Sequence, residues 1–110
     1  MINTVKEVQA VAEVARSHYG KVPMAVASGG EMTVLEATLN NVRLRNLFDV
    51  VVSIDDVERG KPEPDIFLLA AQRLGTAPED CIVYEDSDAG LEAARRAGMR
   101  SIDVLRELIC

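Results

Sequence analysis

The sequence is poor in the residue types that build metal clusters, disulfide frameworks and histidine-dependent active sites. Its 110 residues include one histidine, which cannot form a Cys/His metal cluster or a Ser-His-Asp triad. Only two cysteines are present, and Cys110 is the last residue, so no disulfide framework is expected. Cys81 is most simply a small core residue, and a reducing, cytoplasmic setting is the default expectation.

Long apolar runs and an excess of basic residues are also missing. No apolar run reaches the roughly 20 residues that a membrane helix needs, and residues 1–20 carry acid, unlike a signal peptide. The formal net charge of −6 argues against a nucleic-acid or anionic-membrane partner. With 48% apolar and 27% charged residues, the composition is that of a soluble globular protein, and the length predicts one domain over residues 1–110.

What is present is an alternation of helical patterns and short apolar runs. The helical patterns include a capping box at Thr4–Glu7, a proline at the first helical position (Pro64) and a predicted N-cap at Asp88. The apolar runs predict four strands, at Val22–Ala27, Val50–Ile54, Cys81–Tyr84 and Ser101–Val104. This order predicts an α/β fold with a doubly wound parallel sheet, whose strands all place their carboxyl ends at one edge, where ligands bind.

A hydroxyl and two glycines follow the first predicted strand. Ser28-Gly29-Gly30 combines a side-chain oxygen with flexible amides at a strand-to-helix turn, and amides at a helix N-terminus favour an anion. The alternative is an ordinary Ser/Gly turn.

A lysine and two acidic pairs lie in other predicted loops. Lys61 precedes Pro62, which favours an extended backbone that could hold the ammonium over the site; the alternative is a solvated surface lysine. Glu85-Asp86 leaves the third strand and offers the hard oxygens that magnesium prefers; the alternative is an acidic first turn that stabilises a helix dipole. Asp55-Asp56 is interpreted as a solvated turn, with an extension of the acidic rim as the alternative.

In order, these motifs resemble those of the haloacid dehalogenase (HAD) superfamily, in its sugar-phosphatase and β-phosphoglucomutase-like branch. Ala27-Ser28-Gly29 resembles the second family motif, Gly60–Asp65 the third and Tyr84–Gly90 the fourth. The resemblance implies a Rossmann-like core in which Ser28, Gly29 and Lys61 bind phosphate, while Glu85 and Asp86 hold Mg²⁺ weakly. The expected ligand is a phosphorylated small molecule or inorganic phosphate.

The family pattern begins with a central strand that ends in Asp-x-Asp, and a helical cap domain that selects the substrate follows it. No such strand occurs upstream of Ser28 in this sequence, so no catalytic residue is assigned and the chain resembles a truncated HAD core. The strands that flank the absent one would lack a shared neighbour. Because unpaired strand edges recruit other strands, we expect a homodimer or a complementing chain.

Three functional interpretations follow from this combination. The chain is a phosphatase-like core with little activity alone, half of an enzyme that another chain completes, or a non-catalytic module that binds phosphate or a partner. A signalling receiver domain is a fourth interpretation, suggested by Asp55-Asp56 and Lys61-Pro62, but it ranks last because its motifs occur in a different order.

Overall fold

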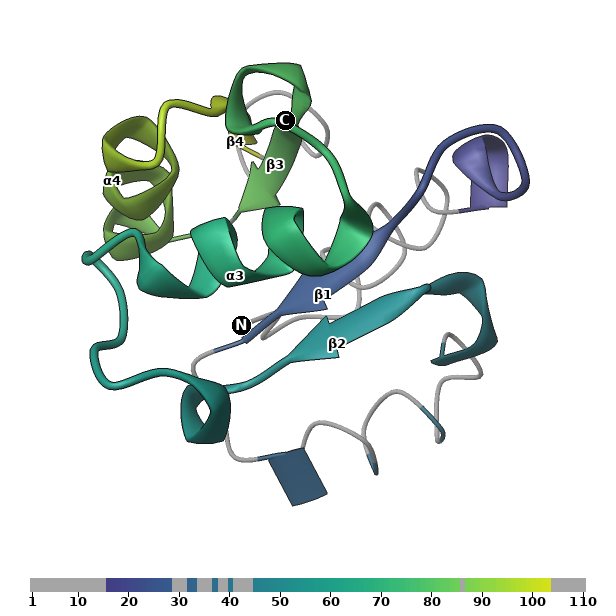
Figure 1. Ribbon diagram of the computed structural model, residues 1–110, viewed down its shortest axis with the longest axis horizontal. Coiled ribbons are helices and arrows are strands. Elements are labelled where there is room, and N and C mark those ends of the chain that lie inside the picture. Colours follow the sequence, from purple (N-terminus) through teal and green to yellow (C-terminus); the bar gives the residue numbers. More distant parts are fainter. Residues whose placement is uncertain are drawn as a thin grey trace.

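The structure, a computed structural model, describes residues 16–28, 32–33, 37, 40, 45–85 and 87–103 (Figure 1). Several predicted features lie outside the described residues: the capping box at Thr4–Glu7 and the site residues Gly29 and Asp86.

The described residues contain four strands, which lie at the positions predicted from the apolar runs. They are β1 (Ala25–Ala27), β2 (Val50–Val52), β3 (Ile82–Glu85) and β4 (Arg100–Asp103). Strand β1 pairs with β2 and β3 pairs with β4, and both pairings are parallel. The predicted α/β fold with parallel strands is therefore confirmed.

The two long helices of the described chain begin and end for local reasons. Helix α3 (Asp65–Leu74) follows Pro64 and ends at Gly75, whose φ of 71° is the left-handed conformation that glycine adopts without strain. Helix α4 (Asp88–Arg96) is capped by Ser87, whose Oγ accepts the Gly90 N–H. The predicted cap, Asp88, is wrong by one residue: it is the first helical residue, where its carboxylate still favours the helix dipole.

The main core lies where α3 and α4 pack on the strands. Helix α3 contacts β1 and β2, α4 contacts β3 and β4, and the two helices contact each other (Figure 1). Most of the buried residues are small or branched, which lets the helices approach closely; they are Val52, Ile66, Phe67, Ala70, Ala71, Ala93, Ala94, Ala97 and Met99.

Strand β2 buries both of its faces, as strands of a parallel sheet commonly do. Val52 belongs to the core under α3, whereas Val51 packs with Val26, Leu47 and Phe48 on the other side. The connections that the structure describes include three 3₁₀ turns, which are η1 (Arg45–Leu47), η2 (Ile54–Asp56) and η3 (Pro78–Asp80).

The strands form two separate pairs within the described residues. No backbone pairing there joins β1 to β3, so each has one hydrogen-bonded neighbour in the part of the chain that the structure describes. This arrangement matches the expectation that two strands lack a shared neighbour. No helix of the described chain is long and apolar enough to cross a membrane.

Candidate functional site

A buried ion pair joins the carboxyl ends of β1 and β3. Lys61 Nζ lies 2.8 Å from Glu85 Oε2 and 3.3 Å from the carbonyl oxygen of Ala27, the residue before Ser28. The side chains of Lys61 and Glu85 are only 11% and 6% exposed. Three of the predicted site positions, Ser28, Lys61 and Glu85, are thus brought to one edge of the fold, and the alternative of a solvated surface lysine is wrong.

The Lys61 ammonium is held by three different groups. Besides its two oxygen partners, Nζ lies 5.0 Å from the centre of the Phe67 ring, which rises from the first turn of α3. An ammonium has three N–H donors. The third has no partner among the residues that the structure describes, so it is available to an anion at this edge.

Glu85 lies against the start of α4. Its Oε1 accepts hydrogen bonds from the Ser87 N–H and the Ser87 hydroxyl, each at 3.3 Å. Gly90 packs so closely that a Cβ there would overlap the Glu85 carboxyl group. The Glu85 carboxylate therefore occupies the space that a side chain at Gly90 would fill. It lies next to the N-terminus of α4, where the helix dipole favours negative charge.

The loop that carries Lys61 is anchored on both sides. Arg59 donates to both carboxylate oxygens of Asp65, at 3.2 and 3.0 Å, and this pairing raises the pKa of Arg59 above its ordinary value. Glu63 accepts from Arg96 of α4 at 3.1 Å. The Lys61–Pro62 peptide bond is cis. These contacts tie the loop to α3 and α4, which fixes the direction from which Lys61 enters the site.

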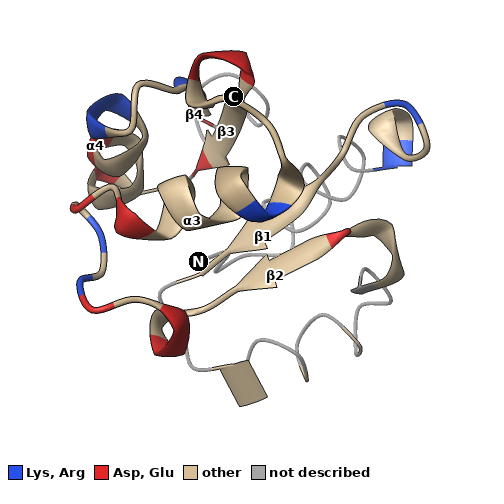
Figure 2. Cartoon of the chain, viewed as in Figure 1, with Lys and Arg blue, Asp and Glu red and all other residues tan. Residues whose placement is uncertain are grey.

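Ser28 and Asp55 lie at the ends of β1 and β2. The Ser28 N–H donates to the Val52 carbonyl at 2.9 Å, which extends the strand pairing by one residue. Asp55 is exposed, as expected for a solvated turn, but its carboxylate accepts the Met32 N–H at 2.9 Å. Figure 2 shows the acidic residues of η2 and of the end of β3.

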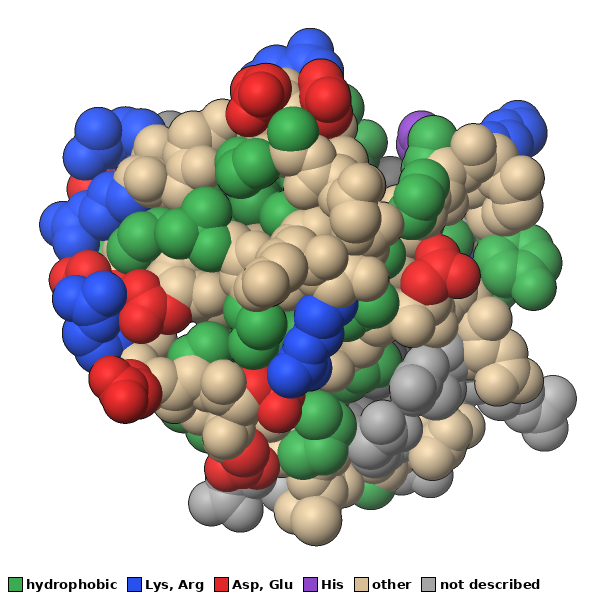
Figure 3. All heavy atoms as spheres, in the orientation of Figure 1, with side chains coloured by type: hydrophobic (Ala, Val, Ile, Leu, Met, Phe, Trp, Pro, Cys, Tyr) green, Lys and Arg blue, Asp and Glu red, His purple; other side chains and the backbone are tan. Residues whose placement is uncertain are grey.

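Charged side chains elsewhere form ion pairs on the surface. Basic and acidic groups alternate beside α4 and the loop before α3 (Figure 3). Hydrogen bonds from Arg95 and Arg96 lower the pKa of Glu92 to about 2. Burial, with Asp80 and Glu79 nearby, raises the pKa of the Cys81 thiol, which fits an unreactive, partly buried cysteine.

The described residues contain no group of three or more His, Cys, Asp or Glu side chains that could hold a metal ion. Of the predicted metal ligands only Glu85 is described, since Asp86 lies outside the described residues. Glu85 offers carboxylate oxygens of the kind magnesium prefers, although one of them is held by Lys61.

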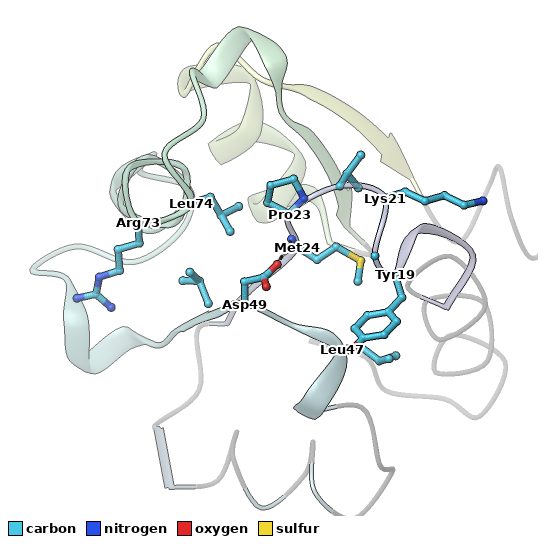
Figure 4. Close-up of a pocket in the computed structure, with 11 residues that line it drawn as sticks. Tyr19, Lys21, Pro23, Met24, Leu47, Asp49, Arg73 and Leu74 are labelled. Carbon is cyan, nitrogen blue, oxygen red and sulfur yellow. Dashed lines mark hydrogen bonds between the residues drawn. The ribbon is translucent and has the colours of Figure 1, made fainter.

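A cavity of about 640 Å³ lies at the opposite, amino-terminal end of β1 and β2 (Figure 4). Tyr19, Met24, Leu47 and Arg73 are among its lining residues. The described site residues Ser28, Lys61 and Glu85 are not among its lining residues, so this cavity is separate from the Lys61 edge.

Three contributors to the site were missed by sequence reasoning. Phe67 was given no role at the site, Asp55 was interpreted as part of a solvated turn, and Asp88 was predicted as the helix cap in place of Ser87. A signal existed for Ser87, because a serine three residues before Gly90 fits the N-cap pattern as well as Asp88 does. The partnership of Asp55 with Met32 spans 23 residues and follows from no local pattern.

Comparisons with known proteins agree with this geometry. A model of the haloacid dehalogenase-like hydrolases matches residues 4–98. The chain is 50% identical over 92 residues to the fructose-1-phosphate phosphatase YqaB of Escherichia coli, an alignment that covers 84% of this chain and 49% of that protein. The chain thus spans about half the length of this relative.

Solved structures show the same core. The chain resembles CbbY from Rhodobacter sphaeroides in complex with phosphate, with a TM-score of 0.75 and 34% identity over 90% of this chain and 44% of that one. It also resembles the β-phosphoglucomutase of Clostridium difficile, with a TM-score of 0.73 and 26% identity over 87% of this chain and 41% of that one.

Proposed function

Since the chain belongs to the haloacid dehalogenase-like hydrolase family, we propose that it is the phosphate-binding core of a phosphohydrolase acting on phosphorylated small molecules. The observation that carries the proposal is the position of Lys61 Nζ, which bonds to the carboxyl ends of both β1 and β3. Open α/β sheets bind their ligands at this edge. The names of two relatives, a fructose-1-phosphate phosphatase and a protein crystallised with phosphate, support a sugar phosphate as the substrate class.

In this proposal the phosphoryl group lies between Lys61 and the turn that begins at Ser28. The Ser28 hydroxyl and the Gly29 amide donate to phosphoryl oxygens, and Lys61 neutralises their charge with its remaining N–H. Positioning and charge neutralisation are the main tasks of a protein in phosphoryl transfer. Lys61 suits this task because its other two donors are already bound, which fixes the ammonium before the ligand arrives.

The proposed cofactor is Mg²⁺, with Glu85 and Asp86 as the residues that would hold it. The donor chemistry fits, because Glu85 presents a hard carboxylate in the space left by Gly90. When bound, the ion would neutralise phosphoryl charge. Lys61 already pairs with Glu85 Oε2, so the metal must compete with a buried ammonium and weak binding is expected.

The proposed core lacks a nucleophile of its own. Residues 1–27 contain no aspartate, and neither Asp55 nor Asp86 is assigned that role. We therefore expect the 110-residue chain to lack phosphatase turnover when it is alone. A module that binds phosphate without catalysis is the alternative, and it makes the same prediction for the isolated chain.

The phosphohydrolase core and the non-catalytic module differ in their response to an added strand. We propose that such a strand completes the active site. Strands β1 and β3 each have one hydrogen-bonded neighbour among the described residues, and the Lys61 ammonium bonds to the carboxyl ends of both. A strand that is parallel to both, and that ends in an aspartate, would place a carboxylate near Lys61. A complementing chain or a second copy of this chain are the candidate sources of a pairing strand.

The test is hydrolysis of an aryl phosphate and of a panel of sugar phosphates with magnesium. We expect no turnover by the 110-residue chain above that of its Lys61→Ala variant. A chain carrying an Asp-x-Asp strand, added in trans, should restore turnover, and Lys61→Ala should abolish that restored activity. Turnover in the usual enzyme range by the chain alone, lost in Glu85→Ala, would contradict the proposal. Light scattering over a range of concentrations separates self-association from complementation.

A further inference from the structure

Among the described residues, the Lys61 ammonium has one partner that is not an oxygen atom, the ring of Phe67. Nζ lies over this ring, 5.0 Å from its centre. A cation within about 6 Å of a ring centre is attracted by the negative charge of the ring face. This attraction is electrostatic and needs no directed N–H bond, so it leaves the third N–H of Lys61 to an anion.

Both members of this contact are withdrawn from water. Phe67 is 6% exposed, and the side chain of Lys61 is 11% exposed. Burial removes much of the hydration that stabilises an ammonium in solution, so the groups that replace water matter more. A cation over an aromatic face is held more strongly when the two groups are desolvated than when they lie on the surface.

Local contacts hold the ring and the lysine against each other. Phe67 belongs to the core cluster under α3, together with its neighbour Ile66. The two hydrogen bonds from Arg59 to Asp65 close the loop that carries Lys61 onto the first turn of α3. The core thus fixes the ring, and the lysine enters from a loop that is fixed at the same turn of the helix.

We propose that Phe67 is a positioning residue whose ring face holds the Lys61 ammonium at the carboxyl edge of the strands; its effect on phosphate binding rests on the function proposed above. The same side chain also packs in the core, and substitution by an aliphatic residue changes packing and ring charge together. The two contributions are separated only by a change that alters the charge of the ring face and keeps its shape.

Ring fluorination makes this change. Fluorine substituents draw electron density from the face of the ring and weaken its attraction for a cation. Phe67 is therefore replaced by phenylalanines that carry one, two or three ring fluorines. The matched control is the same series in a chain with Lys61→Met and Glu85→Leu, which removes the ammonium and its buried partner and leaves the ring in the core.

Urea unfolding of the full 110-residue chain measures the contact without a ligand. The trifluorinated ring should raise the unfolding equilibrium constant of the Lys61 chain about tenfold relative to its effect in the control chain. This difference should grow with each added fluorine. Effects of fluorine on packing and apolar burial occur in both chains and cancel in the comparison. Equal effects of fluorination in the two chains would overturn the proposal.

Titration of the Lys61 chains with inorganic phosphate, followed by NMR at the Ser28 amide, measures what the contact does for the ligand. Because the ammonium is no longer held in advance, the trifluorinated ring should weaken phosphate binding about fivefold. Unchanged binding would leave Phe67 a packing role alone, and tighter binding would mean that the ring competes with phosphate for the ammonium; either result overturns the positioning role. If the unmodified chain binds no phosphate, the proposed function fails, and the urea comparison decides whether the ring holds Lys61.

Discussion

The effect of Gly90→Ala on the free energy of unfolding tests the packing at the site. Helix propensity predicts that this substitution stabilises the chain, whereas packing against Glu85 predicts that it destabilises it. Gly90 is the third residue of α4, and replacing a helical glycine by alanine normally stabilises a helix by about 1 kcal/mol. Here a Cβ would overlap the carboxyl group of Glu85. Glu85 is 6% exposed and paired with Lys61 at 2.8 Å, so the carboxylate cannot move away without breaking that pair.

The packing cost is larger than the gain in helix propensity, so Gly90→Ala is expected to destabilise the chain. Inserting a methyl group into a packed site costs about 1–3 kcal/mol, and breaking a buried ion pair costs about 3–5 kcal/mol. Because the added Cβ displaces the Glu85 carboxylate from Lys61, the cost of breaking the ion pair applies, and the gain of about 1 kcal/mol in helix propensity is subtracted from it. We therefore expect Gly90→Ala to reduce the free energy of unfolding by about 2–4 kcal/mol.

Urea unfolding followed by circular dichroism measures this change, and a second background isolates its cause. In a chain that carries Lys61→Met and Glu85→Ala, the space beside Gly90 is open and no ion pair remains. There Gly90→Ala should be neutral or stabilise by up to about 1 kcal/mol. The reasoning is refuted if Gly90→Ala stabilises the unmodified chain, or if it destabilises both backgrounds equally.

Two further predictions concern charged pairs. Lys61→Met should destabilise the chain by about 3–5 kcal/mol, because it leaves Glu85 buried without its ammonium, and adding Glu85→Leu should recover most of that loss in urea unfolding. Little effect of Lys61→Met would contradict the buried pair. The pKa of Glu92 is lowered from 4.5 to about 2, so its carboxylate contributes stability above pH 4.5 that is lost as the pH falls through 2. Glu92→Gln should flatten the decline of the unfolding midpoint in that window, most clearly at low salt; an unchanged slope would argue against this pair.

The fold was predictable because its signals are local. Short apolar runs marked all four described strands within three residues at each end. The convergence of Lys61 with Glu85 followed from topology, since parallel strands place their carboxyl ends at one edge.

The remaining parts of the site depend on contacts that sequence pattern does not specify. Ser87 and Asp88 are both good N-cap residues, and only the extended backbone of Ser87 shows which one caps α4. The bond from Met32 to Asp55 joins elements 23 residues apart and requires the rigid η2 turn. Phe67 occupies a core position by its spacing, and its second contact, with the Lys61 ammonium, depends on where the preceding loop lies.

The central claim is that Ser28 and Lys61 form a phosphate subsite at the carboxyl edge of the strands. NMR titration of the 110-residue chain with inorganic phosphate tests it most directly, with the Ser28 amide and the Lys61 side chain as reporters. The claim predicts saturable shifts at both reporters. The Ser28 shift should be lost in Lys61→Ala, and both shifts should persist in Asp49→Ala, which removes an exposed carboxylate at the opposite end of the strands. Shifts scattered over the surface, with Ser28 and Lys61 unmoved, would contradict it.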